Sequence, residues 1–306
     1  MNCSSRRTWL GFGVIGTAVA SLTIALLVVG ALSAAGRPEV TAVQEASSPS
    51  DLEPLQVPFD RLLDLYVRDG FVYYRALKSD RSRFDRYIAS LDVASSAYDA
   101  WTREQKIAYW INAYNAFVLK TIIDNYPIKG GSKEFPVNSV RQIPGAFEKL
   151  PHRAGGRTVT LDEIDKTILA ELKEPRALLA LGRGSIGGGR LHSEAYAAAR
   201  LDEQLKKVQS ECVTRKECVT IDTAQGTLAV TPLFGWREPQ FTETLGQQEL
   251  AANPGRTPLE RAILRLITPH VLPMEREFLA ENKFKLTYQP YDWRLNDLTG
   301  GMPDRR

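Results

Sequence analysis

The sequence has few of the residues from which metal sites are built. It contains only three histidines, His152, His192 and His270, and three cysteines among 306 residues. No two of these histidines have the spacing of metal ligands, and Cys212 and Cys218 have no histidine or third cysteine nearby to complete a zinc site. We therefore predict no metal and no cofactor.

The chain after residue 37 also lacks an excess of charge of either sign. Residues 1–37 contain Arg6, Arg7 and Arg37 but no Lys, Asp or Glu, so they supply the whole formal net charge of +3. The remaining residues carry 36 basic groups, as many as the 36 acidic ones. A nucleic-acid-binding domain needs a basic surplus on its folded part. We therefore expect no nucleic-acid partner.

Charge is absent from the apolar run of 27 residues at positions 9–35. A membrane span needs about 20 such residues, whereas the apolar core of a signal peptide has about 7–15. Because two arginines precede the run, the positive-inside rule places residues 1–8 in the cytoplasm. We predict a single-pass inner-membrane anchor that contacts the lipid bilayer and carries an extracytoplasmic, periplasmic domain. Cleavage and export is the alternative, since residues 5–10 resemble a twin-arginine signal and residues 33–35 a cleavage site.

The two cysteines near the middle of the domain fit this compartment. Cys212 and Cys218 lie between a helical pattern and a strand pattern, separated by a short loop. Such a loop can bring two Cα atoms within disulfide distance, and an oxidising compartment preserves the bond. We predict a disulfide between them.

The pattern from residue 57 to 300 is typical of one globular domain. Residues 36–56 mix proline, serine and acidic residues without periodicity and are predicted to form a linker. Apolar spacing and capping residues predict helices over 59–66, 75–91, 103–125, 161–172 and 193–210, and another that begins at 258. Turn residues predict hairpins at 146–160 and 219–230 and a last strand at 284–288. Because regular βαβ alternation is missing, we predict a helix-rich α+β fold with small antiparallel hairpins, after an N-terminal transmembrane helix.

The segment 107–119 is apolar on almost every side of its predicted helix, which indicates burial. Asn112 and Asn115 lie three residues apart within it and are therefore near neighbours. Buried amide groups need partners. We expect these two either to hold neighbouring backbone or to line the floor of a ligand pocket.

A glycine-rich loop, residues 182–194, is the second unusual feature. Glycines free the backbone to turn its N–H groups toward one point, and the arginines and the start of the following helix add positive potential. We predict an anion or carbonyl-oxygen site formed by Gly184, Gly187, Gly188 and the flanking Arg183 and Arg190. The alternative is a tight structural loop. Neither a dinucleotide site nor a phosphate-binding P-loop is predicted, because the βαβ context and the Gly-Lys-Ser/Thr sequence are missing.

His192 is the best candidate for a general base. Ser185 lies seven residues before it and Glu194 two residues after it. A hydroxyl nucleophile, a base and an orienting carboxylate are the groups that hydrolases and acyl-transfer enzymes use. A catalytic trio of Ser185, His192 and Glu194 is therefore an alternative hypothesis.

Six motifs stand out in order along the chain, at Val72–Leu77, Tyr109–Ala116, Thr160–Ile164, Glu174–Arg176, Ser193–Tyr196 and Tyr291–Asn296. Together they resemble the motifs of the domain-of-unknown-function family 547. The resemblance spans residues 59–298 and implies a domain that occurs alone in exported bacterial proteins. It implies no activity. Many relatives have Cys-Ala-Ser and Cys-Pro in the loop, where this chain has Arg183-Gly184-Ser185 and Gly188-Gly189.

Three functions are consistent with these patterns. The first is binding of a small anionic or carboxylate-bearing ligand between the Asn112/Asn115 helix and the glycine-rich loop. The second is a hydrolase or acyl-transfer enzyme that uses Ser185 and His192. The third is a scaffold or interaction domain of the cell envelope. An open cavity bordered by the loop and Asn112 would favour the first.

Overall fold

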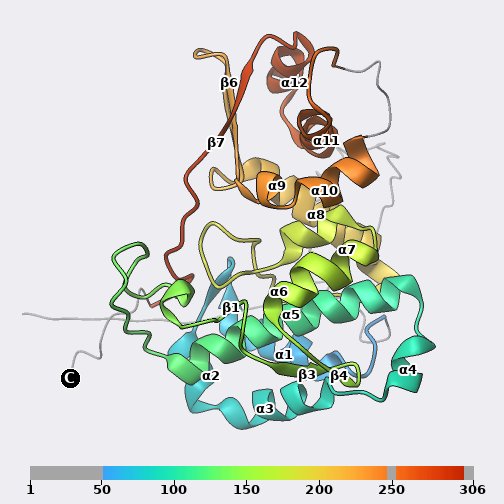
Figure 1. Ribbon diagram of the computed structural model, residues 1–306, viewed down its shortest axis with the longest axis vertical. Coiled ribbons are helices and arrows are strands. Elements are labelled where there is room, and N and C mark those ends of the chain that lie inside the picture. The colour runs from blue at the N-terminus through green and yellow to red at the C-terminus, as the bar shows by residue number, and fades with distance from the viewer. Residues whose placement is uncertain (1–50, 247–252, 300–306) are drawn as a thin grey trace, which may run out of the picture. The chain divides into compact units, whose positions relative to one another are not determined.

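The computed structural model describes residues 51–246 and 253–299, which belong to one compact unit (Figure 1). The predicted cytoplasmic tail at 1–8, the predicted anchor at 9–35 and residues 36–50 of the predicted linker lie outside the described residues. Within the described residues, no helix is long and apolar enough to cross a membrane.

The described residues form an α+β fold that is rich in helices, as predicted. The helices are α1 (Val57–Tyr66), α2 (Tyr74–Ser79), α3 (Arg81–Ser90), α4 (Ser95–Asp99), α5 (Arg103–Asn125), α6 (Leu161–Glu163), α7 (Leu169–Glu171), α8 (Leu201–Thr214), α9 (Leu233–Trp236), α10 (Glu238–Phe241), α11 (Pro258–Ile267) and α12 (Pro273–Ala280). The strands are β1 (Val67–Arg68), β2 (Phe71–Val72), β3 (His152–Ala154), β4 (Arg157–Val159), β5 (Val219–Asp222), β6 (Thr227–Val230) and β7 (Lys285–Tyr288). Short 3₁₀ turns lie at Val140–Gln142, Pro175–Ala180, Ala198–Arg200 and Thr268–His270, and π-helical turns at Ile164–Ile168 and Thr242–Gly246.

The central helix α5 organises the N-terminal part of the fold (Figure 1). Thr102 begins it with a capping box, in which its hydroxyl accepts from the Gln105 amide and the Gln105 side chain accepts from the Thr102 amide. Every residue from 107 to 119 is buried, because α2, α3, α6 and the turns around the glycine loop pack on different sides of the helix. The predicted bounds 103–125 are therefore confirmed.

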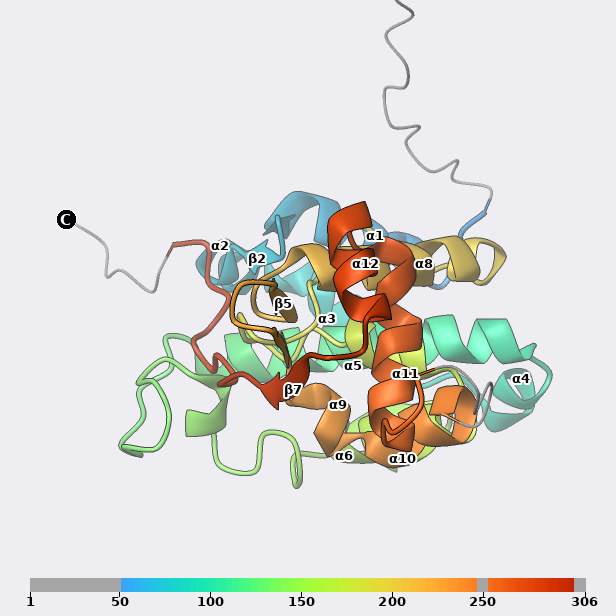
Figure 2. The same ribbon diagram turned by 90° about the horizontal axis from the view of Figure 1, so that it is seen from above.

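The sheets are small. β1 pairs with β2, and β3 pairs with β4 across Gly155 and Gly156, both antiparallel. β5 and β6 form the predicted antiparallel hairpin, but β7 adds to β6 in parallel, which the prediction of antiparallel hairpins alone did not include. Figure 2 shows β7 beside this hairpin. The parallel pairing arises because α9 to α12 return the chain to the turn of the hairpin, where β6 also begins, before β7 starts.

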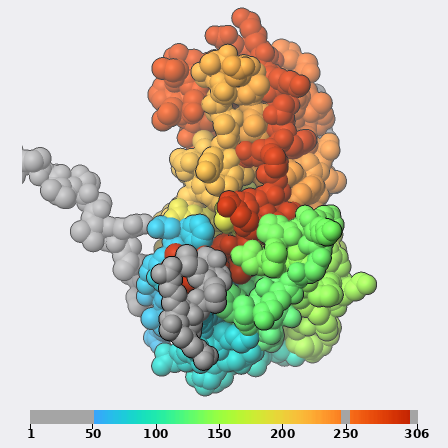
Figure 3. Space-filling model, turned by 90° about the vertical axis from the view of Figure 1, so that its left-hand side faces the viewer, coloured from blue at the N-terminus to red at the C-terminus, as the bar shows by residue number. Residues whose placement is uncertain are grey.

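The C-terminal segment 291–298 joins two distant parts of the chain. Its residue Asn296 accepts from the Val72 amide (2.9 Å), and Leu298 donates to the Val72 carbonyl (3.0 Å). On its other side, Leu295 pairs with Ser185 in an isolated antiparallel bridge. Figure 3 shows this segment in red between blue N-terminal residues and green residues near position 140.

Several sequence-based boundaries are wrong. The helix predicted at 75–91 is divided at Asp80 into α2 and α3. The helix predicted at 193–210 begins only at Leu201, because the amides of residues 195–197 donate to side chains of Asp60, Asn112 and Gln204 and not to helix carbonyls. The predicted linker also ends too late. Gln56 is buried and accepts from the Tyr87 hydroxyl (2.7 Å), so this residue belongs to the domain.

His152 gives the domain a pH-dependent stability. Its ring is buried on β3 and stacks on Phe117, with centroids 4.4 Å apart. Burial, together with the charge of Lys120, lowers the pKa of His152 to about 4, although Asp124 opposes this. The folded state therefore disfavours a proton that the unfolded chain binds below about pH 6.5.

We predict that the free energy of unfolding falls by about 3 kcal/mol between pH 6.5 and pH 4 because of His152. Urea denaturation at a series of pH values should show this slope in the wild type and a flatter one in His152→Gln. His270→Gln leaves His152 in place and should retain most of the slope. Equal slopes in the wild type and His152→Gln would contradict the assignment.

Candidate functional site

The glycine loop, defined here as residues 182–190, borders two clefts of more than 200 Å³. The first, which we call the loop cleft, has a volume of about 230 Å³. It is lined by Asp69, Gly70, Phe71, Ser185, Ile186, Gly189, Arg190, Arg215, Glu217 and Asn296. The second, which we call the aromatic cleft, has a volume of about 240 Å³ and is lined in part by Arg183, Trp236, Arg237 and Trp293.

The backbone amides of the glycine loop are already engaged. Gly182 donates to the Asn115 side chain (2.8 Å), and Ile186 and Gly187 donate to carbonyls of the C-terminal segment (3.0 and 2.9 Å). Gly184, Gly188 and Gly189 donate to the carbonyls of Gly182, Ser185 and Leu181, respectively. These N–H groups are therefore not turned toward a ligand. The structure corrects the prediction that Gly184, Gly187 and Gly188 present their amides to an anion.

The glycines instead allow the loop to pack closely against its neighbours. Gly184 has φ +65°, and a Cβ there would lie 2.5 Å from the Ile122 side chain. A Cβ on Gly187 would lie 2.8 Å from the Asp292 backbone nitrogen. A side chain at position 184 would displace the Ile122 side chain and strain a backbone with positive φ, whereas one at position 187 would require a shift of the C-terminal segment.

Asn112 and Asn115 hold backbone on both sides of the loop. The Asn112 amide donates to the Tyr196 carbonyl (2.8 Å) and accepts from the Tyr196 N–H (2.9 Å). Asn115 donates to the Ala180 carbonyl (3.2 Å) and accepts from Gly182. Neither residue lines the loop cleft or the aromatic cleft. Both residues therefore hold neighbouring backbone, which is the first of the two roles expected from the sequence, and do not line the floor of either cleft.

The predicted catalytic trio is not assembled. The Ser185 hydroxyl lies 2.9 Å from the Tyr291 hydroxyl, whereas His192 Nε2 lies 2.8 Å from a Glu211 carboxylate oxygen. Glu194 pairs with Arg200 (2.9 Å) and Lys207 (3.4 Å). Since each residue has a different partner, the geometry does not provide a Ser–His–Glu relay.

The buried arginine of the loop has a partner that the sequence analysis did not identify. Arg183 is 2.8 Å from Asp165, which also binds Arg237 at 2.7 Å. Burial alone would raise the pKa of Asp165, but the two guanidinium groups outweigh it and hold this pKa below its ordinary value. Asp165 is therefore ionised at neutral pH. Asp165 lies in the π-helical turn between α6 and α7, and such turns are frequent at functional sites.

The loop cleft contains two further guanidinium groups with weak carboxylate partners. Arg190 pairs with Asp69 at 2.7 Å, but the Asp69 side chain is 90% exposed. Arg215 donates to the carbonyls of Ile186 (2.7 Å) and Gly188 (3.1 Å), and Glu217 is 3.9 Å away. Burial lowers the pKa of Arg215 despite that carboxylate.

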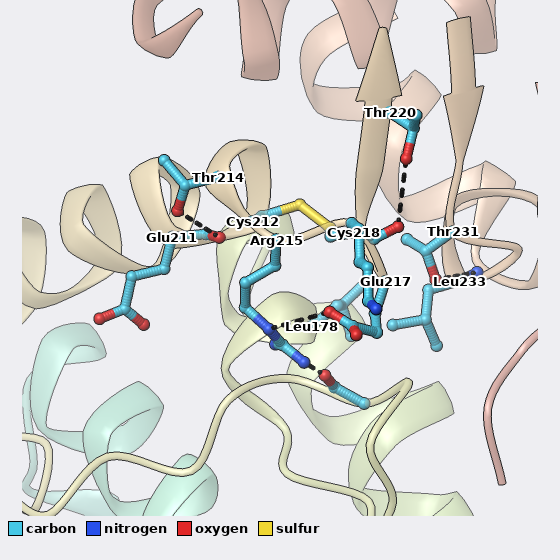
Figure 4. The surroundings of a disulfide bond; sticks show 12 residues. Leu178, Glu211, Cys212, Thr214, Arg215, Glu217, Cys218, Thr220, Thr231 and Leu233 are labelled. Carbon is cyan, nitrogen blue, oxygen red and sulfur yellow. Dashed lines mark hydrogen bonds and ion pairs between the residues drawn. A yellow bond between two sulfur atoms is a disulfide. The ribbon is translucent and has the colours of Figure 1, made fainter. Parts of the chain in front are cut away.

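A disulfide fixes the position of Arg215. Cys212 at the end of α8 and Cys218 just before β5 form this bond, with their Cα atoms 5.1 Å apart. Figure 4 shows Arg215 extending from the closed loop toward the carbonyls of the glycine loop. Sequence reasoning predicted the bond but missed its role, although the presence of Arg215 between the two cysteines was a usable signal. In the described residues no cluster of three or more His, Cys, Asp or Glu suited to a metal ion is present.

Together, the α+β fold and the charged clefts beside its glycine loop define a small domain with a candidate ligand site. Residues 98–213 match the family model described as "Protein of unknown function, DUF547". The match confirms the resemblance over the middle of the chain, including α5, the glycine loop and nearly all of α8. No curated protein and no solved structure matches the chain.

We predict that Asn112→Ala destabilises the domain by about 3 kcal/mol or more. The substitution leaves a buried N–H and a buried carbonyl of Tyr196 without partners, and each such group costs about 1–3 kcal/mol. Asn125→Ala is the matched control, because Asn125 is exposed and its side chain donates to the Thr121 carbonyl of its own helix. Urea denaturation of both variants measures the difference. Similar losses in the two variants would show that Asn112 does not hold the Tyr196 segment.

Proposed function

We propose that this chain is a membrane-anchored, extracytoplasmic domain that binds a small anionic or carboxylate-bearing ligand in the loop cleft. Residues 9–35 serve as the anchor in this proposal. Of the two arginines in the site predicted from the sequence, Arg190 lines the loop cleft. Side-chain guanidinium groups replace the loop amides as the anion-binding groups, because those amides are engaged elsewhere.

The incomplete neutralisation of Arg215 is the main support for this proposal. Its side chain is only 23% exposed, and its close partners are two neutral carbonyls. A buried guanidinium group is stabilised best by a carboxylate at hydrogen-bond distance. A ligand carboxylate in the cleft would supply that partner, and a guanidinium group can bind it through two parallel hydrogen bonds.

Arg190 adds a second cation that a ligand can recruit. Its ion pair with Asp69 is largely exposed to solvent, and such pairs contribute only about 0–1 kcal/mol. The second carboxylate near Arg190, on Glu211, is 3.7 Å away and also binds His192. Exchanging these contacts for a ligand carboxylate therefore costs little. The cleft volume of about 230 Å³ favours a small ligand.

We predict that Arg190→Gln weakens the binding of such an anion at least tenfold, because a charge-assisted hydrogen bond is worth about 1.5–3 kcal/mol. Isothermal titration calorimetry with citrate, succinate and inorganic phosphate measures this effect. Arg265→Gln, which replaces an exposed arginine on α11, is the matched control and should bind as the wild type does. Arg215→Gln should have a larger effect than Arg190→Gln.

Two outcomes would argue against the loop cleft as the site. One is a wild-type protein that binds none of the three anions. The other is binding that is equal in the wild type, Arg190→Gln and Arg265→Gln. Circular dichroism of each variant establishes that it is folded, which matters most for Arg215→Gln because Arg215 also holds the loop carbonyls.

A further inference from the structure

We propose that the aromatic cleft is a second binding site and that its ligand is an acidic sugar, a hydroxylated ring that carries a carboxylate. This inference does not depend on the loop cleft. The glycine loop separates the two sites, since Arg183 lines one and Ser185 the other. Tyr291 lies between them, with its hydroxyl 2.9 Å from Ser185 Oγ and its ring centroid 4.4 Å from that of Trp293.

The wall of this cleft has one positive charge more than it has negative charges. Arg183 and Arg237 share the single carboxylate of Asp165, and the side chains of the three residues are 4%, 12% and 3% exposed. The other charged residues that line the cleft pair one to one, Arg141 with Glu148 and Lys166 with Asp162. A buried surplus charge is unfavourable unless a counter-charge is present. A ligand carboxylate placed beside Arg237 supplies it.

Aromatic rings form another part of the lining. Trp236 and Trp293 stack at 6.1 Å with their planes only 16° apart, and Trp236 is 44% exposed. Arg141 covers Trp293 at 5.2 Å from its ring, so Trp236 is the tryptophan with a surface available to a ligand. Such a surface binds the flat, apolar face of a ring. Trp236 and Arg237 both line this cleft, so the ring surface and the cation border the same volume.

The remaining lining distinguishes a sugar from an aromatic acid. Glu148, Asp162 and Lys166 line the same cleft and are partly exposed, at 44%, 22% and 50% of their side chains. An aromatic acid would remove water from these groups without replacing its hydrogen bonds, which is unfavourable. Ring hydroxyls donate to the carboxylates and accept from the ammonium group. The volume of about 240 Å³ is below the roughly 300–1,000 Å³ of sites for drug-sized ligands, which favours a single ring.

The test uses the full chain and the probes glucuronate and galacturonate, with glucose and benzoate as comparisons. Titration calorimetry and quenching of tryptophan fluorescence measure binding. We expect at least one uronate to bind at least tenfold more tightly than glucose, which lacks the carboxylate, and than benzoate, which lacks the hydroxyls. Trp236→Ala and Arg237→Gln should each weaken uronate binding at least tenfold.

Matched controls test the contribution of the Trp236 ring and that of the Arg237 charge separately. Tyr73→Ala removes an exposed aromatic side chain that does not line the cleft, and Arg265→Gln removes an exposed arginine on α11. Both should bind the uronates as the wild type does. Because Trp236 is partly exposed, Trp236→Ala is expected to fold. It therefore tests the aromatic cleft even if Arg237→Gln does not fold.

The inference is overturned if neither uronate binds, if glucose or benzoate binds as tightly as the uronates, or if Trp236→Ala binds normally. The Arg190→Gln variant separates this site from the loop cleft. Uronate binding that Arg190→Gln weakens and Trp236→Ala does not would place the sugar in the loop cleft and contradict the second site. Failure of citrate, succinate and phosphate to bind would count against the loop cleft alone.

Discussion

A single buried carboxylate, that of Asp165, joins three parts of the fold that are separated in the sequence. It binds Arg183 of the glycine loop and Arg237 between α9 and α10, from its own place in the helical segment 161–171. A buried ion pair adds little net stability, but the loss of one partner costs about 3–5 kcal/mol. The triad therefore specifies the arrangement of these segments. Arg183 lines the aromatic cleft, and Ser185, two residues later, lines the loop cleft. By holding Arg183, the triad therefore also sets which side of the glycine loop faces each cleft.

Local signals in the sequence predicted much of the fold. Thr102, Thr160 and Thr257 each accept a hydrogen bond from the amide three residues later, and the helices begin where these residues indicate. The prediction failed at residues 193–200, where the amides bind side chains from distant parts of the chain. Helical periodicity does not contain that information, since Asn112 lies more than eighty residues before Tyr196. The parallel addition of β7 to β6 is likewise a consequence of the path of the chain through α9 to α12.

The candidate site was predictable only in part. The sequence singled out Arg183 and Arg190 but not Asp165, although Asp165 occupies an apolar face with Leu161, Ile164 and Ile168, and an acid in such a place indicates a buried partner. Nothing in the sequence near Arg237 connects it to Asp165. The glycines illustrate a different ambiguity. Glycine-rich composition is typical both of an anion cradle and of close packing, and only the partners of the N–H groups distinguish the two.

The π-helical turn at Ile164–Ile168 has a consequence for the evolution of the domain. A π-helical turn corresponds to an α-helix that has gained one residue, and one residue rotates the following side chains by about 100° around the axis. A deletion of one residue in this turn would restore a regular helix and change the direction in which it presents its side chains, including the carboxylate that meets Arg183 and Arg237. A change in length, without any substitution, is thus enough to disconnect the acid from both arginines.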